Sequence, residues 1–211
     1  FKGDDDAMRK WIVDEGLKSA NPIVCQACCW LAWNLRMKEA ADGLRAVQRR
    51  TMKSRKHERT AFGATAALIY SRAATREEAL TWAQDGTFPL RMAAARTAPY
   101  LPDEEMRELV TVLLGDPDWR IRRRTLRSIH EAKQEAYLDE LVKALESDPR
   151  LACRATAHAA LADISGRDLE YDAAAWRRWV KDRKTIPPDA AKKRTYSYAR
   201  YYRHAVVAGR A

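Results

Sequence analysis

Four arginines in the middle of the chain could together bind an anion. They are Arg120, Arg123, Arg124 and Arg127, and their spacing of i, i+3, i+4 and i+7 places them on one face of a helix. The residues between them predict an opposite, buried face. Trp119 lies beside these four residues, which we call the arginine stripe, and could stack on a ligand. The pattern predicts a site for an anion or an acidic partner, with an ordinary solvated face as the alternative.

Two further segments are strongly basic. Residues 49–59 hold six basic residues and one acidic residue, and we call this segment the basic island. Its basic side chains are those of Arg49, Arg50, Lys53, Arg55, Lys56 and Arg59. Residues 176–211 hold eleven basic and two acidic residues, in a chain of 211 residues with a net charge of +10. This distribution favours a polyanion, an acidic protein face or an anionic membrane surface as the partner.

The C-terminal tail, which follows Pro187 and Pro188, mixes basic and aromatic residues. The residues that could dock are Tyr196, Tyr198, Arg200, Tyr201, Tyr202 and Arg203. Such a mixture suits a nucleic-acid backbone with stacked bases. Tyr and Arg are also enriched where proteins dock on one another. We favour protein docking for the tail and keep nucleic acid as the alternative.

The sequence contains no recognisable catalytic motif. Its four histidines are scattered, and there is no Ser/His/Asp set, no phosphate-binding glycine loop and no HExxH. Cys25, Cys28 and Cys29 crowd about one helical turn, and Cys153 stands alone. A zinc site would need two more ligands, so small buried packing residues are the favoured interpretation. We therefore predict no enzyme activity, no metal and no cofactor.

A repeated pattern organises the second half of the chain. An aspartate is followed six positions later by an arginine, with small or apolar residues at helical spacing around them. The three copies are Asp85 and Arg91, Asp116 and Arg122, and Asp148 and Arg154. Successive copies start 31 and 32 residues apart, and a period of this size indicates a solenoid of helical repeats.

These copies resemble HEAT repeats, in which each repeat is a pair of antiparallel helices. The resemblance implies an all-α, right-handed α-solenoid of about five helical pairs over residues 1–165. It also implies that the aspartates start the second helices, where they could act as caps, and pair with arginines of neighbouring repeats in a ladder. Second helices would line a concave surface. One repeat before the arginine stripe, the equivalent positions include Arg96, which we add to the predicted binding surface.

The segment after the repeats resembles the closing segment of planctomycete-type bacterial HEAT-repeat proteins. It begins with Gly166, a natural helix stop. Asp172 is a candidate cap for a short helix. Trp176 and Trp179 follow on that helix at i and i+3, where they would cover the open end of the stack. A ligand-binding aromatic pair is the alternative. We predict a capping segment over residues 166–186 and a basic aromatic tail over residues 187–211.

Local patterns predict several helix boundaries. Residues 4–19 predict a first helix, Asn21 is a candidate cap for the second, and Thr75 with Glu78 forms a candidate capping box. No apolar run approaches the roughly 20 residues of a membrane span. Because the chain begins at Phe1 rather than Met, both a cytoplasmic and an exported location stay open.

The predicted function is a non-enzymatic scaffold or assembly subunit that binds an acidic protein surface, within a larger assembly or alone. A nucleic-acid-binding module is the alternative. Within that alternative, Asp118, Trp119 and Arg120 resemble in a limited way the Trp and Asp that HEAT-like alkylpurine DNA glycosylases place on a basic concave face.

Overall fold

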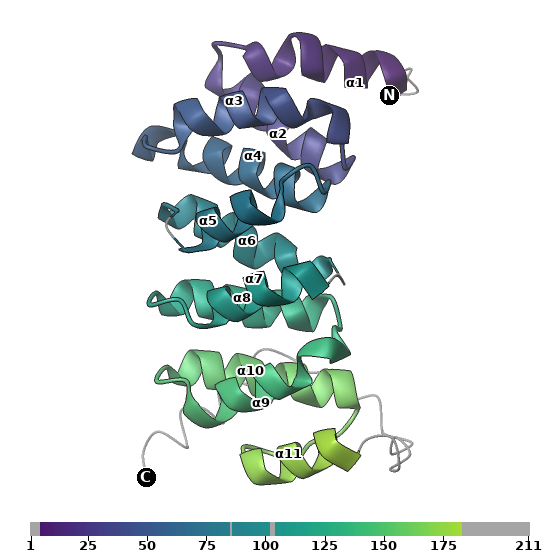
Figure 1. Cartoon of the computed structure of the whole chain (residues 1–211), viewed down its shortest axis with the longest axis vertical. Coiled ribbons are helices and arrows are strands. Elements are labelled where there is room, and N and C mark those ends of the chain that lie inside the picture. The colour runs from purple at the N-terminus through teal and green to yellow at the C-terminus, as the bar shows by residue number, and fades with distance from the viewer. Residues whose placement is uncertain (1–4, 85, 102–103, 183–211) are drawn as a thin grey trace. The chain divides into compact units, whose positions relative to one another are not determined.

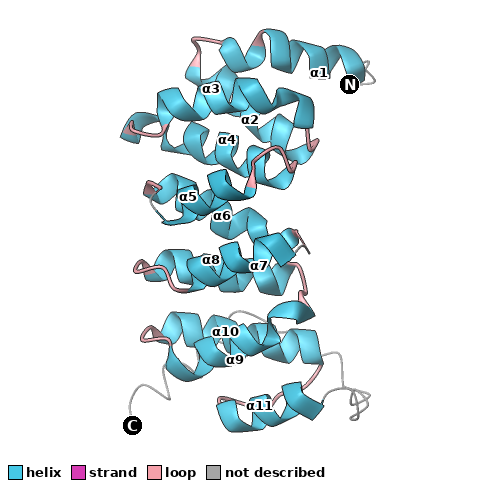
Figure 2. Cartoon of the chain, in the orientation of Figure 1, coloured by secondary structure: helices cyan, strands magenta, loops and turns pink. Residues whose placement is uncertain are grey.

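The computed structural model describes residues 5–84, 86–101 and 104–182, and these residues form helices and connecting turns without any strand (Figures 1 and 2). This confirms the all-α prediction. The α-helices are α1 (Asp5–Asp14), α2 (Pro22–Asn34), α3 (Ala41–Thr51), α4 (Glu58–Tyr70), α5 (Arg76–Gln84), α6 (Phe88–Thr97), α7 (Glu104–Leu114), α8 (Trp119–Glu131), α9 (Leu138–Ser147), α10 (Leu151–Ser165) and α11 (Ala173–Asp182). Short 3₁₀ helices are η1 (Gly16–Lys18), η2 (Lys38–Ala40), η3 (Arg55–His57), η4 (Ala98–Tyr100) and η5 (Glu135–Tyr137).

The chain divides into two compact units, residues 1–113 and residues 114–211. In the first unit α2, α4 and α6 pack in succession, while α3 packs on α4 and α5 packs on α6. In the second unit α8 and α9 both pack on α10, and α11 packs on α9. Consecutive helices thus pack as the pairs α3 with α4, α5 with α6, and α9 with α10, and within each unit the second helices contact one another, as in a HEAT-like α-solenoid.

Most predicted helix boundaries rest on local hydrogen bonds that the structure contains. The side chain of Asn21 caps α2. Thr75 and Glu78 exchange two hydrogen bonds, of 2.9 and 3.1 Å, which is the reciprocal pattern of a capping box. Asp172 accepts a hydrogen bond from the first turn of α11, and Gly166 ends α10 with a φ of 70°. These predictions are confirmed.

The predicted first helix over residues 4–19 is wrong in length. The α-helix ends at Asp14, and the chain continues as η1. At this point Gly16 approaches α2 closely, since a Cβ at this position would lie 2.4 Å from Sγ of Cys28. The turn at Gly16 therefore brings the backbone against the cysteine cluster, which a continuous helix would not do.

Three second helices end in the same turn, which the sequence analysis missed. Residues in the left-handed region follow α2, α4 and α8, with φ values of 50°, 59° and 49°, and they are Arg36, Arg72 and Lys133. The N–H of the next residue donates to a carbonyl five positions back: Met37 to Ala32, Ala73 to Leu68, and Gln134 to Ile129. This is the Schellman motif. Glycine usually fills the left-handed position, so basic residues there hide the motif from a sequence search.

The segment after α10 folds back through an aromatic cluster. His158 of α10 stacks on Tyr171, with ring centroids 4.7 Å apart, and its Nε2 lies 3.2 Å from the carboxylate of Asp168. Trp176 is fully buried and its indole N–H donates to the carbonyl of Glu170. Trp179 is half-buried and packs edge-on against the ring of Trp176. These contacts pack His158 against the segment that follows α10.

The left-handed conformation of Gly166 makes a prediction about stability. Nothing lies within 4 Å of a Cβ placed there, so backbone strain alone should set the cost. We expect Gly166→Ala to destabilise the second unit by about 1–2 kcal/mol, measured by urea unfolding followed by circular dichroism. Gly166→Asn is the control and should cost less, because Asn tolerates this conformation. Equal losses for the two variants would contradict the backbone explanation.

Candidate binding surfaces

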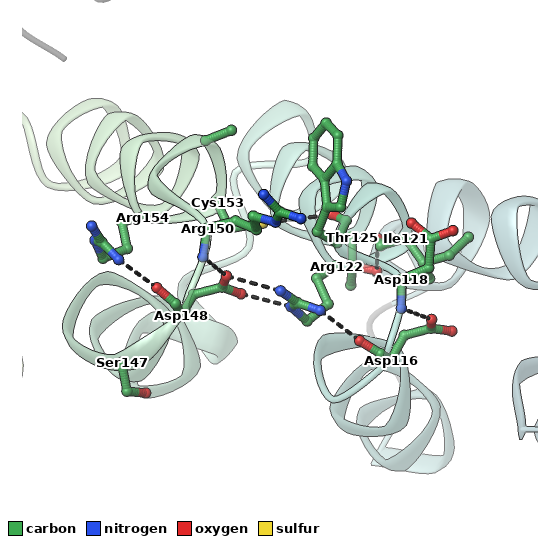
Figure 3. Close-up of polar contacts among 12 residues, drawn as sticks. Asp116, Asp118, Ile121, Arg122, Thr125, Ser147, Asp148, Arg150, Cys153 and Arg154 are labelled. Carbon is green, nitrogen blue, oxygen red and sulfur yellow. Dashed lines mark hydrogen bonds and ion pairs between the residues drawn. The ribbon is translucent and has the colours of Figure 1, made fainter. Parts of the chain in front are cut away.

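A buried ion pair joins the last two helical pairs (Figure 3). Arg122 of α8 donates to both carboxylate oxygens of Asp148, in the turn before α10, at 2.7 and 3.0 Å. The side chains are 10% and 6% exposed. An arginine of one repeat thus reaches the aspartate of the next, which is the geometry that the family resemblance implied for the ladder.

The arginines of the ladder also close their own turns. Arg122 donates through Nη1 to the carbonyl of Asp116 at 2.8 Å, and Arg154 donates to the carbonyl of Asp148 at 2.7 Å. In the first unit Arg91 donates to the carbonyl of Gly86 at 2.9 Å. Asp85, the third predicted aspartate, lies outside the described residues. Each arginine therefore binds the entry turn of its own helix in addition to any carboxylate partner.

The predicted capping role of the ladder aspartates needs correction. Asp116 accepts a hydrogen bond from the N–H of Asp118 at 2.7 Å, and Asp148 accepts one from the N–H of Arg150 at 2.8 Å. Both bonds lie in the turn before the helix. The cap of α8 is Asp118, whose side chain accepts from the N–H of Arg120. The ladder aspartates therefore shape the turn that precedes the helix (Figure 3).

The surroundings of Asp148 favour its charged form. Burial raises the pKa of this carboxyl, but hydrogen bonds from Arg122 and from the N–H of Arg150, with the charge of Arg122, outweigh burial and lower the pKa. The nearby thiol of Cys153 responds in the opposite sense, because burial and the charge of Asp148 raise its pKa to about 12. Asp148 is therefore an ionised, structural group at neutral pH.

A second set of ion pairs connects segments about one repeat apart in the sequence, and the sequence analysis did not find it. Four pairs connect residues 30 to 33 positions apart: Arg9 with Glu39, Arg45 with Glu78, Arg76 with Glu108, and Arg177 with Glu146. Arg45 and Glu78 form the best-shielded pair, with two hydrogen bonds of 2.8 and 3.0 Å. The hydrogen bond from Arg45 lowers the pKa of Glu78, against the effect of burial.

The arginine stripe lies on α8 as predicted by its spacing, but acidic residues of the same segment bind most of it. Arg120 pairs with Asp118 at 2.6 Å. Arg124 and Arg127 both pair with Glu131, at 2.7 Å in each case. Arg123 is partly buried, as is Trp119. The stripe is thus largely neutralised by its own helix, which weakens it as a site for an external anion.

Arg96 lies in the first unit and has an aromatic partner there. Its guanidinium sits 5.0 Å from the ring centroid of Trp33. Trp33 in turn contacts Trp30 and Phe62, with centroids 4.7 and 6.1 Å away. These contacts give Arg96 a local cation–π role, so its assignment to one surface with the stripe stays a prediction.

The basic island differs from the arginine stripe because most of its cations are not paired with acidic side chains of the described residues. It covers the end of α3, η3 and the start of α4. Five of its basic side chains are exposed and have no hydrogen bond or ion pair with another described residue: Arg49, Lys53, Arg55, Lys56 and Arg59. Arg50 is the exception, since its guanidinium donates to the carbonyl of Leu17 and to Sγ of Cys25. The island therefore presents five available cations at one turn between two helices.

Several predicted features fall elsewhere. The predicted docking residues of the tail, Tyr196, Tyr198, Arg200, Tyr201, Tyr202 and Arg203, lie outside the described residues. Within the described part of the chain, no group of three or more His, Cys, Asp or Glu is placed to hold a metal ion. Among these residues no helix combines the length and apolarity that a membrane crossing demands.

The helical pairing and the Asp–Arg contacts agree with a comparison against protein families. The model described as HEAT repeats matches residues 76–162. Residues 76–162 form a HEAT repeat domain. HEAT repeats generally mediate protein interactions. The comparison with curated proteins found no match, and the narrower resemblance of the closing segment to planctomycete-type bacterial proteins receives no support.

The buried pair of the HEAT domain makes a second prediction. Asp148→Ala leaves the charge of Arg122 buried without its carboxylate, so we expect it to destabilise the protein by about 3 kcal/mol. Urea unfolding at pH 7 measures this loss, and hydrogen exchange should localise it to α8 and α10.

Two controls separate the ion pair from packing. The double variant Arg122→Met, Asp148→Leu removes both charges and should recover much of the loss. The deficit of Asp148→Ala should also shrink in acid. A lowered folded pKa means that the pair contributes fully above the unfolded pKa of Asp and loses its contribution as the pH falls through the folded pKa. A deficit that is independent of pH would contradict the electrostatic explanation.

The pairing within the stripe makes a third prediction. Glu131→Gln should free Arg124 and Arg127 and strengthen retention on a heparin column, measured as the salt concentration at elution. Glu135→Gln is the matched control, because it removes the same charge from an exposed residue outside these pairs. If both variants elute together, net charge rather than the pairing of the stripe controls anion binding.

Proposed function

We propose that this protein is a non-enzymatic binding scaffold or assembly subunit, and that the basic island holds an acidic protein surface. The observation that carries this proposal is the set of five exposed, unpaired cations between α3 and α4. The arginine stripe and the tyrosines of the tail are secondary contacts in this proposal. The HEAT repeats support the scaffold role in general terms, since they commonly present extended binding surfaces.

The island favours an acidic protein over nucleic acid as its partner. Residues 49–59 contain no Trp, Tyr or Phe, so this segment lacks the large aromatic side chains on which single-strand binders stack successive bases. Its exposed Lys and Arg side chains can pair with carboxylates at a protein surface. Such pairs act mainly on association rate and specificity, which suits a scaffold that recruits a partner.

The glycosylase alternative gains nothing from the geometry of its proposed acid. The carboxylate of Asp118 caps α8 and accepts hydrogen bonds from the side chain of Arg120 at 2.6 to 3.2 Å. These bonds give Asp118 a structural task at the start of the helix. We therefore retain nucleic-acid binding as an outcome of the test and do not propose base excision.

The test compares two sets of charge-removing variants. In the island variant, Arg49, Lys53, Arg55, Lys56 and Arg59 become Gln, and in the matched stripe variant Arg120, Arg123, Arg124 and Arg127 become Gln. The probe is fluorescent poly-glutamate, measured by anisotropy near physiological salt. Each exposed pair contributes about 0.2–1 kcal/mol, so the island variant should bind about tenfold more weakly or worse. The stripe variant should bind within about threefold of the original protein.

Two other outcomes would contradict the proposal. A larger loss in the stripe variant would move the acidic-partner site to α8. Tighter binding to a random-sequence DNA duplex than to poly-glutamate, with a steep log-linear dependence on salt, would replace the protein partner by nucleic acid. Circular dichroism of each variant checks that the helices are intact.

A further inference from the structure

Three cysteines of α2 form a cluster that neither the HEAT repeats nor the proposed function uses. Cys25, Cys28 and Cys29 are all buried, at 3%, 1% and 0% exposure. Cys25 lies in the first turn of the helix, and its N–H donates to the carbonyl of Asn21. Partial positive charge at this end of a helix favours a thiolate. Position at the start of a helix does not by itself make a cysteine reactive, so the groups that contact Cys25 determine its reactivity.

A guanidinium contacts the sulfur of Cys25. Arg50, at the end of α3, donates through Nη2 to Sγ at 3.0 Å and to the carbonyl of Leu17 in η1 at 2.8 Å. A cation at this distance stabilises the thiolate over the thiol. Arg50 is itself an exposed residue. The sulfur of Cys25 is thus in direct contact with a side chain that reaches the protein surface.

The neighbouring elements η1 and α4 bring backbone groups close to the cluster. In its protonated form the thiol of Cys25 donates to the carbonyl of Leu17, with Sγ and the oxygen 3.7 Å apart. From α4, Gly63 approaches Cys29 and carries no side chain. Arg50 is the charged group that acts on Cys25. Cys25 is therefore the thiol of the cluster that is in direct contact with a cation.

The proton affinities of the thiols follow from these contacts. A hydrogen bond from the thiol of Cys29, with the hydrogen bond and charge of Arg50, lowers the pKa of Cys25 to about 6, although burial acts in the opposite direction. The same hydrogen bond, together with burial, raises the pKa of Cys29. Burial and the charge of Cys25 raise the pKa of Cys28. One ionised sulfur is thus held among neutral thiols.

We propose that Cys25 is a modification site, a nucleophilic thiolate held by Arg50 that reacts with hydrogen peroxide and with small electrophiles. The sulfur attacks one oxygen of the peroxide, an S–O bond forms and the O–O bond breaks. The leaving hydroxide takes a proton and becomes water. Cys25 is oxidised by two electrons to a sulfenic acid, and the peroxide is reduced.

The product should be the sulfenic acid rather than a disulfide within the cluster. Side chains three and four positions apart on a helix have Cβ atoms about 5–6 Å apart, whereas a disulfide needs about 3.5–4.5 Å. Bridging Cys25 to Cys28 or Cys29 would require α2 to unwind. The intact helix therefore favours a free sulfenic acid that small reagents can trap.

The test uses the whole folded protein and iodoacetamide from pH 5 to pH 9, with mass spectrometry to locate the label. Cys25 should react at pH 7 at least about tenfold faster than Cys153, whose thiol stays protonated, and its pH midpoint should lie near 6. Treatment with hydrogen peroxide and dimedone should give an adduct at Cys25.

Variants of Arg50 separate activation from accessibility. Arg50→Met removes the charge, so the pH midpoint of Cys25 should rise and its rate at pH 7 should fall by roughly tenfold for each unit of that rise. Arg50→Lys keeps the charge and should restore part of the rate, which covers the case in which Arg50→Met disturbs the fold. Equal reaction rates for Cys25 and Cys153 would overturn the proposal. It would also be overturned if the pH midpoint of Cys25 were the same in Arg50→Met as in Arg50→Lys.

Discussion

The geometry of the second unit depends on where the guanidinium of Arg122 finds its hydrogen-bond acceptors. One side chain binds the carbonyl of Asp116 in its own entry turn and both carboxylate oxygens of Asp148 in the next. A buried charge of this kind tolerates no shift, because any slip would leave it unpaired. With the 32 residues that separate Asp116 from Asp148, a single planar group satisfies both turns. Stability is a smaller part of its role than register, since apolar residues of similar volume could fill the same space.

The two basic surfaces show why a count of charges does not predict a binding site. The arginine stripe has the higher local density of arginine, yet Asp118 and Glu131 occupy three of its four guanidinium groups. The basic island has lower density, but its only acid is Glu58, and most of its cations point to solvent. Whether a cation is available depends on the acids one helical turn away. The pairing of Arg127 with Glu131 at i and i+4 could have been predicted from spacing alone.

Features set by neighbours in sequence were predictable, and features set by neighbours in space were not. The caps at Asn21 and Asp172 and the box of Thr75 with Glu78 need only a few consecutive residues, so composition and spacing indicate them. The Asp–Arg contact was predictable because a family pattern implied it. The contact of Arg50 with Cys25 joins residues 25 positions apart on different helices, and no local pattern indicates it. The same holds for Arg45 and Glu78, and for the aromatic stack that fixes His158.

The left-handed turn that ends α8 also ends α2 and α4, two helices in the part of the chain that lacks the aspartate–arginine pattern. That pattern first occurs at residue 85, and residues 1–72 show no copy of it. Arg36 and Arg72 nevertheless close their helices with the same pair of backbone hydrogen bonds as Lys133. The N-terminal helices thus share this backbone turn with α8 although they lack the aspartate–arginine pattern. An alignment anchored on these three turns would compare equivalent positions along both units, which an alignment anchored on aspartate and arginine cannot do.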